Sequence, residues 1–324
     1  MNKADLRIIF MGTPDFAVGT LKALVENEYN VVAVVTMPDK PMGRHGSVLQ
    51  ASAVKQYAQS VGLPVLQPEK LKDEAFLEDL RSYQADLQIV VAFRMLPEVV
   101  WNMPPKGTFN LHASLLPQYR GAAPINWAII NGDKETGVTT FFLQHEIDTG
   151  EIIHQEHLPI GDEDNVEVIH DALMEMGAAL VLRTVDDILD GSVHSISQSE
   201  LMANITGDGL RPAPKLFREN TQIDWNASAR YIHDFVRGLS PYPAAWTNLV
   251  MPDGTAQVLK IFDSRVGEGT LEPGELMTDG KSSLLVGTGD GVISIRSLQL
   301  AGKKRMPVED FLRGHSVLTG CKLQ

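Results

Sequence analysis

Cysteine is almost absent from this sequence, since Cys321 is the only one among 324 residues. A single cysteine excludes a disulfide framework and a cysteine-based zinc site within one chain, and we expect no metal site. No apolar run is long enough to span a bilayer. The run 6–11 is too short for a signal peptide and lacks a small-residue cleavage site, so it is better interpreted as a strand. We therefore expect a cytoplasmic protein without membrane contact.

Several familiar motifs are also missing. The segment Gly12-Thr13-Pro14 is not the G-x-G-x-x-G dinucleotide loop, and Pro14 has no N–H to offer a pyrophosphate. The stretch 274–282 resembles a P-loop, but it has one residue too many and lies between short predicted strands. Neither H-E-x-x-H nor G-x-S-x-G occurs. Hydride chemistry loses support, and the other signatures give no alternative.

Positive charge is scarce, and the formal net charge is −13. The cations are unevenly spread, because residues 209–324 carry 14 of the 28 Lys and Arg but only 12 of the 41 Asp and Glu. Such asymmetry can indicate a nucleic-acid contact in the second half. The simpler interpretation is a near-neutral domain, and charge alone favours it.

Apolar runs and helical periodicity alternate through the first half of the chain. Strands are predicted at 7–11, 31–36, 87–93, 108–112 and 138–143, and helices at 14–28, 51–61, 73–83, 122–130 and 166–189. The run 87–93, which is apolar except for Gln88, is typical of a strand buried on both faces. This alternation predicts an α/β fold with a Rossmann-like, doubly wound and mostly parallel sheet.

A change of pattern follows the segment 207–214, which is a linker by composition. A helix is predicted at 227–239, and strands at 256–262, 283–286 and 292–298 are separated by Asp-Gly turns. Short strands and frequent turns predict a small antiparallel β-barrel of OB-like type. We therefore expect two domains, at 1–206 and 207–324.

The residues that could carry chemistry are concentrated between 109 and 150. Asn110 and His112 lie two apart on a predicted strand, so both side chains point to one face. Ligands of open α/β sheets bind beyond the carboxyl ends of strands, where these residues lie. An isolated Asn and His would more often hydrogen-bond within a core. That alternative weakens here because a loop rich in Ser, Pro and Gly follows directly.

Two blocks carry a resemblance to a known family. The first is Asn110-Leu111-His112-Ala113-Ser114-Leu115-Leu116-Pro117 with Tyr119-Arg120-Gly121, and the second is Asp148-Thr149-Gly150. Their residues and spacing resemble the folate-dependent formyltransferase family. The resemblance extends over the full chain to members whose acceptor is methionine on initiator tRNA, through 10–16, 212–216, 223–225, 236–239 and 302–306. The sequence departs from the family at Ala244, where glycine is usual, and in 36–52, which is less basic than in relatives.

The resemblance implies formyl transfer from 10-formyltetrahydrofolate to an amine. Asn110 and His112 would donate hydrogen bonds to the oxyanion of a tetrahedral intermediate. Asp148 would keep His112 charged and could relay a proton through water. The folate site would be lined by four residues of the following loop, namely Ser114, Leu115, Leu116 and Pro117.

For the acceptor, the resemblance implies initiator methionyl-tRNA as partner. Phe16 could pack against the methionine side chain, or it could be a core residue of the first helix. Arg44 could bind a phosphate near the acceptor end, although most loop arginines are simply solvated. The second domain would bind tRNA through a run of three cations, which could instead pair with Glu309 and Asp310: Lys303, Lys304 and Arg305.

Other acceptors would leave the same core unchanged. An amino-sugar nucleotide, glycinamide ribonucleotide or water could replace the methionyl group. A folate- or tRNA-binding protein without catalysis is an alternative of another class, but a pure binder has no need of Asn110, His112 and Asp148 together. We expect a monomer.

Overall fold

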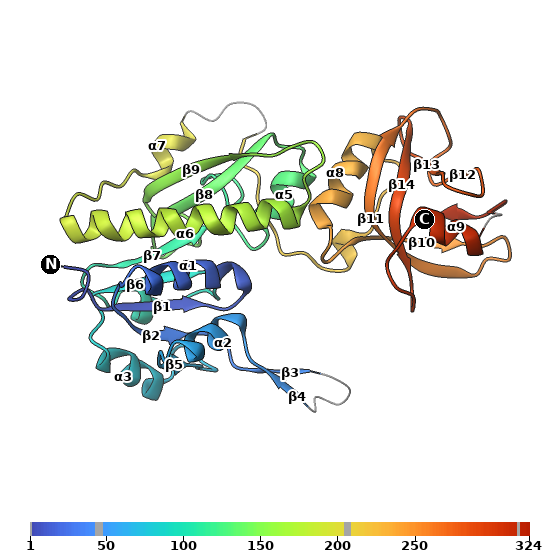
Figure 1. Cartoon of the computed structure of the whole chain (residues 1–324). Coiled ribbons are helices and arrows are strands. Elements are labelled where there is room, and N and C mark those ends of the chain that lie inside the picture. The colour runs from blue at the N-terminus through green and yellow to red at the C-terminus, as the bar shows by residue number, and fades with distance from the viewer. Residues whose placement is uncertain (1, 43–47, 204–208, 316–317) are drawn as a thin grey trace. The chain divides into compact units, whose positions relative to one another are not determined.

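The computed structural model describes residues 2–42, 48–203, 209–315 and 318–324 (Figure 1). The chain forms two compact units that do not follow a single division of the sequence. Unit 1 comprises Met1–Gly121, Thr136–Leu158 and His170–Pro212, and unit 2 comprises Ala122–Glu135, Pro159–Ile169 and Ala213–Gln324. Among the described residues, no helix is long and apolar enough to cross a membrane.

The sheet of unit 1 has seven strands in the order β5-β2-β1-β6-β7-β8-β9. Its parallel strands are β1 (Ile8–Gly12), β2 (Val31–Val35), β5 (Val65–Leu66), β6 (Leu87–Val91) and β7 (Thr108–His112). β8 (Glu135–Phe142) runs antiparallel to β7, and β9 (Ile152–Pro159) forms the edge. The predicted Rossmann-like, mostly parallel sheet is confirmed. The polar strand β9 was not predicted.

Helices cover both faces of this sheet, which explains why β1 and β6 bury every residue. Ile9 and Met11 pack with side chains of α3 (Glu74–Ser82) and α4 (Glu98–Trp101). At Gly12, an added Cβ would lie 2.6 Å from the Cβ of Ala17 in α1 (Asp15–Glu26). Further helices are α2 (Ala53–Ser60), α6 (Val166–Asp190) and α7 (Gln198–Met202), and a hairpin pairs β3 (Lys40–Met42) with β4 (Val48–Gln50).

Unit 2 is dominated by an antiparallel sheet that nearly closes into a barrel. Its strand order is β12-β13-β14-β11-β10-β16, and β15 (Met306–Pro307) pairs with β14. The Leu323 N–H donates to the Gly274 carbonyl at 2.9 Å, which brings the two ends of the sheet together. The predicted barrel is confirmed. The strands are β10 (Ala245–Val250), β11 (Ala256–Gly267), β12 (Leu276–Thr278), β13 (Leu284–Gly287), β14 (Val292–Leu300) and β16 (Lys322–Leu323).

Helices α5 (Pro124–Ile130), α8 (Ala229–Leu239) and α9 (Val308–Gly314) complete unit 2, with the short 3-10 helix Glu219–Thr221. A Cβ added at Gly238 of α8 would lie 2.7 Å from the Ile130 side chain, so glycine permits the close approach of α8 to α5. The core of this unit includes Trp225, whose indole N–H donates to the Thr247 hydroxyl at 3.0 Å.

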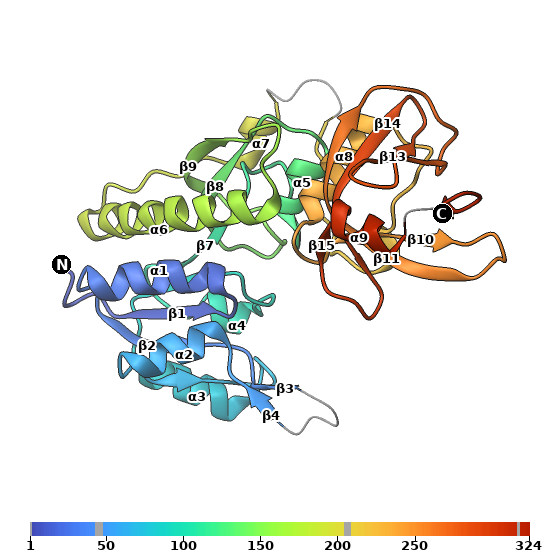
Figure 2. The same ribbon diagram turned by 45° about the vertical axis from the view of Figure 1, so that its right-hand side comes forward.

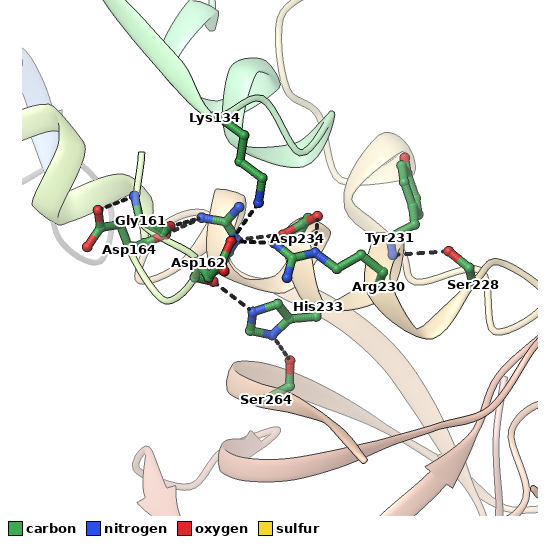
Figure 3. A network of polar contacts seen from close by, with 11 residues as sticks. Lys134, Gly161, Asp162, Asp164, Ser228, Arg230, Tyr231, His233, Asp234 and Ser264 are labelled. Carbon is green, nitrogen blue, oxygen red and sulfur yellow. Dashed lines mark hydrogen bonds and ion pairs between the residues drawn. The ribbon is translucent and has the colours of Figure 1, made fainter. Parts of the chain in front are cut away.

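A polar network joins α8 to the segment 159–165 (Figure 3). Asp234 is 3% exposed and accepts hydrogen bonds from Arg230 at 2.9 Å and from Arg237 Nε at 2.7 Å. These bonds to Asp234 raise the pKa of Arg230. Arg237 also donates from Nη1 to the carbonyls of Gly161 and Asp164, at 3.0 and 2.8 Å. Every charge of the buried pair is therefore compensated.

We expect Asp234→Ala to lower the free energy of unfolding of unit 2 by about 3–5 kcal/mol, because it leaves the buried Arg237 guanidinium without its partner. Urea unfolding followed by tryptophan fluorescence would measure the change. Asp263→Ala is the matched control, since its pair with Arg296 is half-exposed and 3.8 Å long, and should change stability by about 0–1 kcal/mol. Equal losses in both variants would contradict a special role for the buried pair.

Candidate active site

Strand β7 presents Asn110 and His112 on one face, two residues apart, at the carboxyl end of the parallel part of the sheet. Asn110 lies beside Val90 of β6 on one side and Phe141 of β8 on the other. Its side chain is half-buried and makes no hydrogen bond to the described part of the chain, so both amide hydrogens are available to a ligand.

His112 is 8% exposed and has one ring nitrogen already committed. Its Nε2 lies 2.9 Å from the Tyr119 carbonyl oxygen. A carbonyl can only accept, so Nε2 carries a proton and donates it. The other nitrogen, Nδ1, lies 3.9 Å from Asp148 Oδ2, which is an ion-pair distance when the ring is charged. Any hydrogen bond from His112 to a ligand must therefore come from Nδ1.

Asp148 occupies the turn between β8 and β9 with a positive φ of 55°. Its Oδ2 accepts a hydrogen bond from the Gly121 N–H at 2.9 Å, while Oδ1 has no partner among the residues that the structure describes. Gly150 completes the turn, because a Cβ there would lie 1.6 Å from the Phe142 carbonyl oxygen. The structure thus brings His112 and Asp148 into contact, although 35 intervening residues separate them in the sequence.

The loop expected to line a folate site packs closely against β8 and β9. The Leu116 N–H donates to Thr139 Oγ1 at 3.2 Å, and the Leu116 carbonyl accepts from Gln155 at 2.8 Å. Ser114 is fully buried and donates from its hydroxyl to the Gln118 carbonyl. These groups are already satisfied within the chain. A role of Ser114, Leu115, Leu116 and Pro117 in folate binding stays a prediction, and half-buried Leu115 is the most accessible of the four.

The residues expected to meet the acceptor have different environments. Phe16 is 7% exposed and its ring packs edge-on against His170 at 5.3 Å, which fits its expected alternative as a core residue. Its contact with methionine stays a prediction. Arg44 lies outside the residues that the structure describes.

Lys303, Lys304 and Arg305 are all exposed. They belong to the turn that joins β14 to β15, two strands labelled in Figure 2. In the described part of unit 2, none of them forms a salt bridge with Glu309 or Asp310, and Asp310 instead pairs with Arg313 at 2.9 Å. Direct ion pairs between the run and these two carboxylates are thus absent from the described residues, and binding of tRNA by the run stays a prediction.

Arg305 lies at the edge of a cavity of about 660 Å³ in unit 2. Its guanidinium lies over the Phe262 ring, 4.6 Å from the centroid, and its Nε donates to Ser297 Oγ at 3.0 Å. Arg296, the carboxylates Asp263 and Glu309 and several hydroxyls share the lining. The remaining N–H groups of Arg305 can bind an anion such as a phosphate. Three His, Cys, Asp or Glu side chains suited to hold a metal ion do not come together anywhere in the described ranges.

Several contacts around the site were not predicted from the sequence. The segment 207–214 was interpreted as a linker, yet the Tyr119 N–H donates to the Arg211 carbonyl at 2.8 Å. Gln118 binds the same segment through Gly209 O and the Arg211 N–H. Gln198 of α7 binds the backbone of the Asp148 turn. No local pattern in the sequence marks these partners.

Comparison with known proteins finds the same family over both halves of the chain. A family model described as formyl transferase matches residues 6–185, and one described as formyl transferase, C-terminal domain, matches residues 215–316. The chain is 68% identical to a methionyl-tRNA formyltransferase of Parabacteroides distasonis, over 97% of each chain. It is 61% identical to one of Bacteroides fragilis, over 100% of this chain and 99% of the relative.

Solved structures with a similar fold are more distant in sequence. HypX from Aquifex aeolicus, in complex with tetrahydrofolic acid, has a TM-score of 0.62 and 20% identity, covering 95% of this chain and 47% of HypX. The sugar 3N-formyl transferase WlaRD has a TM-score of 0.63 and 17% identity, covering 92% of this chain and 99% of WlaRD. At such identity the similarity concerns the fold alone.

Proposed function

The chain belongs to the formyl transferase family, and we propose that it transfers the formyl group of 10-formyltetrahydrofolate to the amino group of methionine on initiator tRNA. Relatives at 61–68% identity over nearly the whole of both chains carry the name methionyl-tRNA formyltransferase. The product would be the formylated initiator used to begin translation.

The observation that carries the proposal is the arrangement of Asn110, His112 and Asp148 at the end of β7. Attack of the amine on the formyl carbon gives a tetrahedral intermediate whose oxygen is negative. The free amide of Asn110 and the Nδ1–H of a charged His112 ring are donors suited to that oxygen, and both side chains lie on one face of β7. Because Nε2 is bound to Tyr119, the ring cannot turn away from this orientation without losing a hydrogen bond.

Asp148 is placed to manage the protons. The attacking amine must lose one proton, and the folate nitrogen that leaves must gain one. Asp148 Oδ1 has no partner among the described residues and can accept the amine proton directly or through a water molecule. Oδ2 stays bound to the Gly121 N–H and lies 3.9 Å from His112 Nδ1, so the carboxylate faces the ring that would donate to the oxyanion.

The alternative acceptors and a purely binding role are not favoured. The solved sugar N-formyltransferases share only 16–19% identity with this chain, whereas the relatives named for methionyl-tRNA reach 68%. We further propose that the enzyme acts as a monomer, in which Asn110, His112 and Asp148 of one unit would be a complete set of reacting groups. We also propose a cytoplasmic location, because charged tRNA would be the acceptor.

We expect His112→Ala and Asn110→Ala each to lower turnover about 10²-fold or more, because each removes one donor to the oxyanion. Asp148→Asn should be similarly slow and should change the pH–rate profile. Formylation of charged initiator tRNA with formylfolate would be followed by a rapid-quench assay, and folding by circular dichroism. His154→Gln is the matched control, since His154 forms a comparable pair with Asp187 at 2.7 Å outside the site. Near-wild-type turnover of the Asn110 or His112 variant would refute the assigned chemistry.

We expect combined replacement of Lys303, Lys304 and Arg305 by Gln to raise the apparent KM for tRNA and to leave the rate at saturating tRNA unchanged. Each lost phosphate contact should reduce the slope of the logarithm of tRNA affinity against the logarithm of salt concentration by roughly 0.7–0.9. Titration of tRNA at several salt concentrations would measure both quantities. A triple replacement of exposed lysines in unit 1, Lys22, Lys70 and Lys72, changes the net charge equally and serves as control. Identical salt slopes in the wild type and the unit 2 variant would leave the run as a solvated surface.

A further inference from the structure

Gln198, the first residue of α7, is a buried glutamine whose whole amide is used. It is 2% exposed. Its Nε2 donates to the Asp148 carbonyl at 2.8 Å and to the Gly150 carbonyl at 2.9 Å. Its Oε1 accepts from Arg120 Nε at 3.1 Å and Nη2 at 2.6 Å. Two donors and two acceptor positions are thus all satisfied, which a buried amide seldom achieves by accident.

The partners of Gln198 belong to the two chain segments that hold the reacting groups. One segment is the turn that carries the Asp148 carboxylate. The other is the loop after β7, where Arg120 stands between Tyr119 and Gly121. Tyr119 accepts from His112 Nε2, and the Gly121 N–H donates to Asp148 Oδ2. Gln198 therefore joins two parts of the chain through hydrogen bonds. One is the backbone of the turn that carries the Asp148 carboxylate. The other is Arg120, whose two neighbours contact His112 and Asp148.

Both segments adopt backbone conformations that need such support. Asp148 has a φ of 55° and Tyr119 a φ of 59°, in the left-handed region that residues with a side chain rarely occupy. Conformations of this kind persist where surrounding contacts hold them. His112 Nδ1 and Asp148 Oδ2 lie 3.9 Å apart, which is beyond hydrogen-bond distance. A small shift of either segment would therefore change the interaction between the two groups.

Gln198 is itself fixed by pairing with the sheet. The Ile152 and Ile196 backbones exchange two hydrogen bonds of 2.9 Å, and this isolated antiparallel bridge ties the chain just before α7 to the first residue of β9. Ser197 then caps α7 with its hydroxyl. The residue before Gln198 and the bridge at Ile196 thus attach the start of α7 to the sheet.

We propose that Gln198 is a positioning residue that locks the Asp148 turn to Arg120 and so sets the distance and angle between the Asp148 carboxylate and His112. The proposal rests on the proposed formyl transfer and adds to it a residue that contacts neither substrate. Arg120 is its counterpart, because its guanidinium fills both acceptor positions of the Gln198 amide. Removing the hydrogen bonds of the Gln198 amide should leave substrate binding intact and slow the chemical step.

Two variants separate positioning from packing. Gln198→Met keeps the volume and loses all four hydrogen bonds. Gln198→Glu keeps the acceptors for Arg120 but replaces the two donors by a carboxylate oxygen that faces two carbonyls. We expect both to lower kcat about 10- to 100-fold, as for a misplacement of about 1 Å, with the KM values for formylfolate and tRNA within about twofold of wild type. Gln198→Met with unchanged kcat would overturn the proposal.

A double variant tests whether Gln198 acts through Asp148. If it does, the loss from Gln198→Met should largely vanish in an Asp148→Asn background, with the double variant within about twofold of Asp148→Asn alone. A multiplicative loss would mean a general structural defect and would count against positioning. Gln88→Met is the matched control, since Gln88 is a fully buried glutamine of β6 that binds Thr108 and touches neither Asp148 nor Arg120. Its kcat and pH profile should stay at the wild-type values.

Hydrogen exchange tests, without any assay of activity, whether Gln198 stabilises these two segments. In Gln198→Met the amides of Tyr119 and Gly121, which donate to Arg211 and to Asp148, should exchange about tenfold faster or more, while in Gln88→Met the same two amides stay protected. Unchanged exchange would refute the proposal that Gln198 holds the two segments together. If the wild-type enzyme failed to formylate charged initiator tRNA, the proposed function would fall, and the exchange result would still decide whether Gln198 holds the turn.

Discussion

The hydrogen bond between His112 Nε2 and the Tyr119 carbonyl is the contact on which the site depends. A carbonyl oxygen can only accept, so this bond uses the Nε2 proton and leaves Nδ1 as the ring nitrogen that can meet a ligand. To form it, the chain must return to β7 within seven residues, and Tyr119 takes a left-handed backbone conformation to do so. Asp148 then meets the free Nδ1 from the opposite side. Tautomer, ring orientation and carboxylate placement thus follow from one tight loop.

That loop is stabilised by three segments that are distant in the sequence. Gln118 binds the segment 209–211, Arg120 binds Gln198, and the Gly121 N–H binds the Asp148 carboxylate. A loop of this kind has many backbone groups without partners in a helix or sheet, and buried groups of that kind need partners elsewhere. The composition of 207–214 predicts a linker, yet its second part supplies those partners. Segments that look like connections by composition are therefore part of the active-site support.

Unit 2 uses charge in two different ways. Arg237 is buried, and its guanidinium pairs with the Asp234 carboxylate and donates to two backbone carbonyls. It therefore stabilises the contact of α8 with the segment 159–165. Arg305 is exposed, is held in place by Phe262 and Ser297, and keeps donors free toward solvent. The planar guanidinium suits both tasks, since it can serve several acceptors in one plane and can stack on an aromatic ring. The first arrangement stabilises the fold, and the second can bind an anion.

The sequence alone determined the elements whose burial follows a regular period. The apolar run around Leu87–Val91, the helix Val166–Asp190 and the strand Thr108–His112 were predicted almost to the residue, because continuous burial or one apolar face leaves a local pattern. The motif spacing also identified Asn110, His112 and Asp148 as the candidate centre.

Only the tertiary structure decided what surrounds that centre. The edge strand Ile152–Pro159 has a largely polar outer half, and the barrel closes through the two-residue strand Lys322–Leu323, so neither carries a periodic signal. The partners of the site, Tyr119, Gln198 and the segment 209–211, act through backbone groups or a single amide brought together across long distances in the sequence. Hydrogen bonds of that kind have no local signature, because every residue type offers a backbone and only the folded chain selects which groups meet.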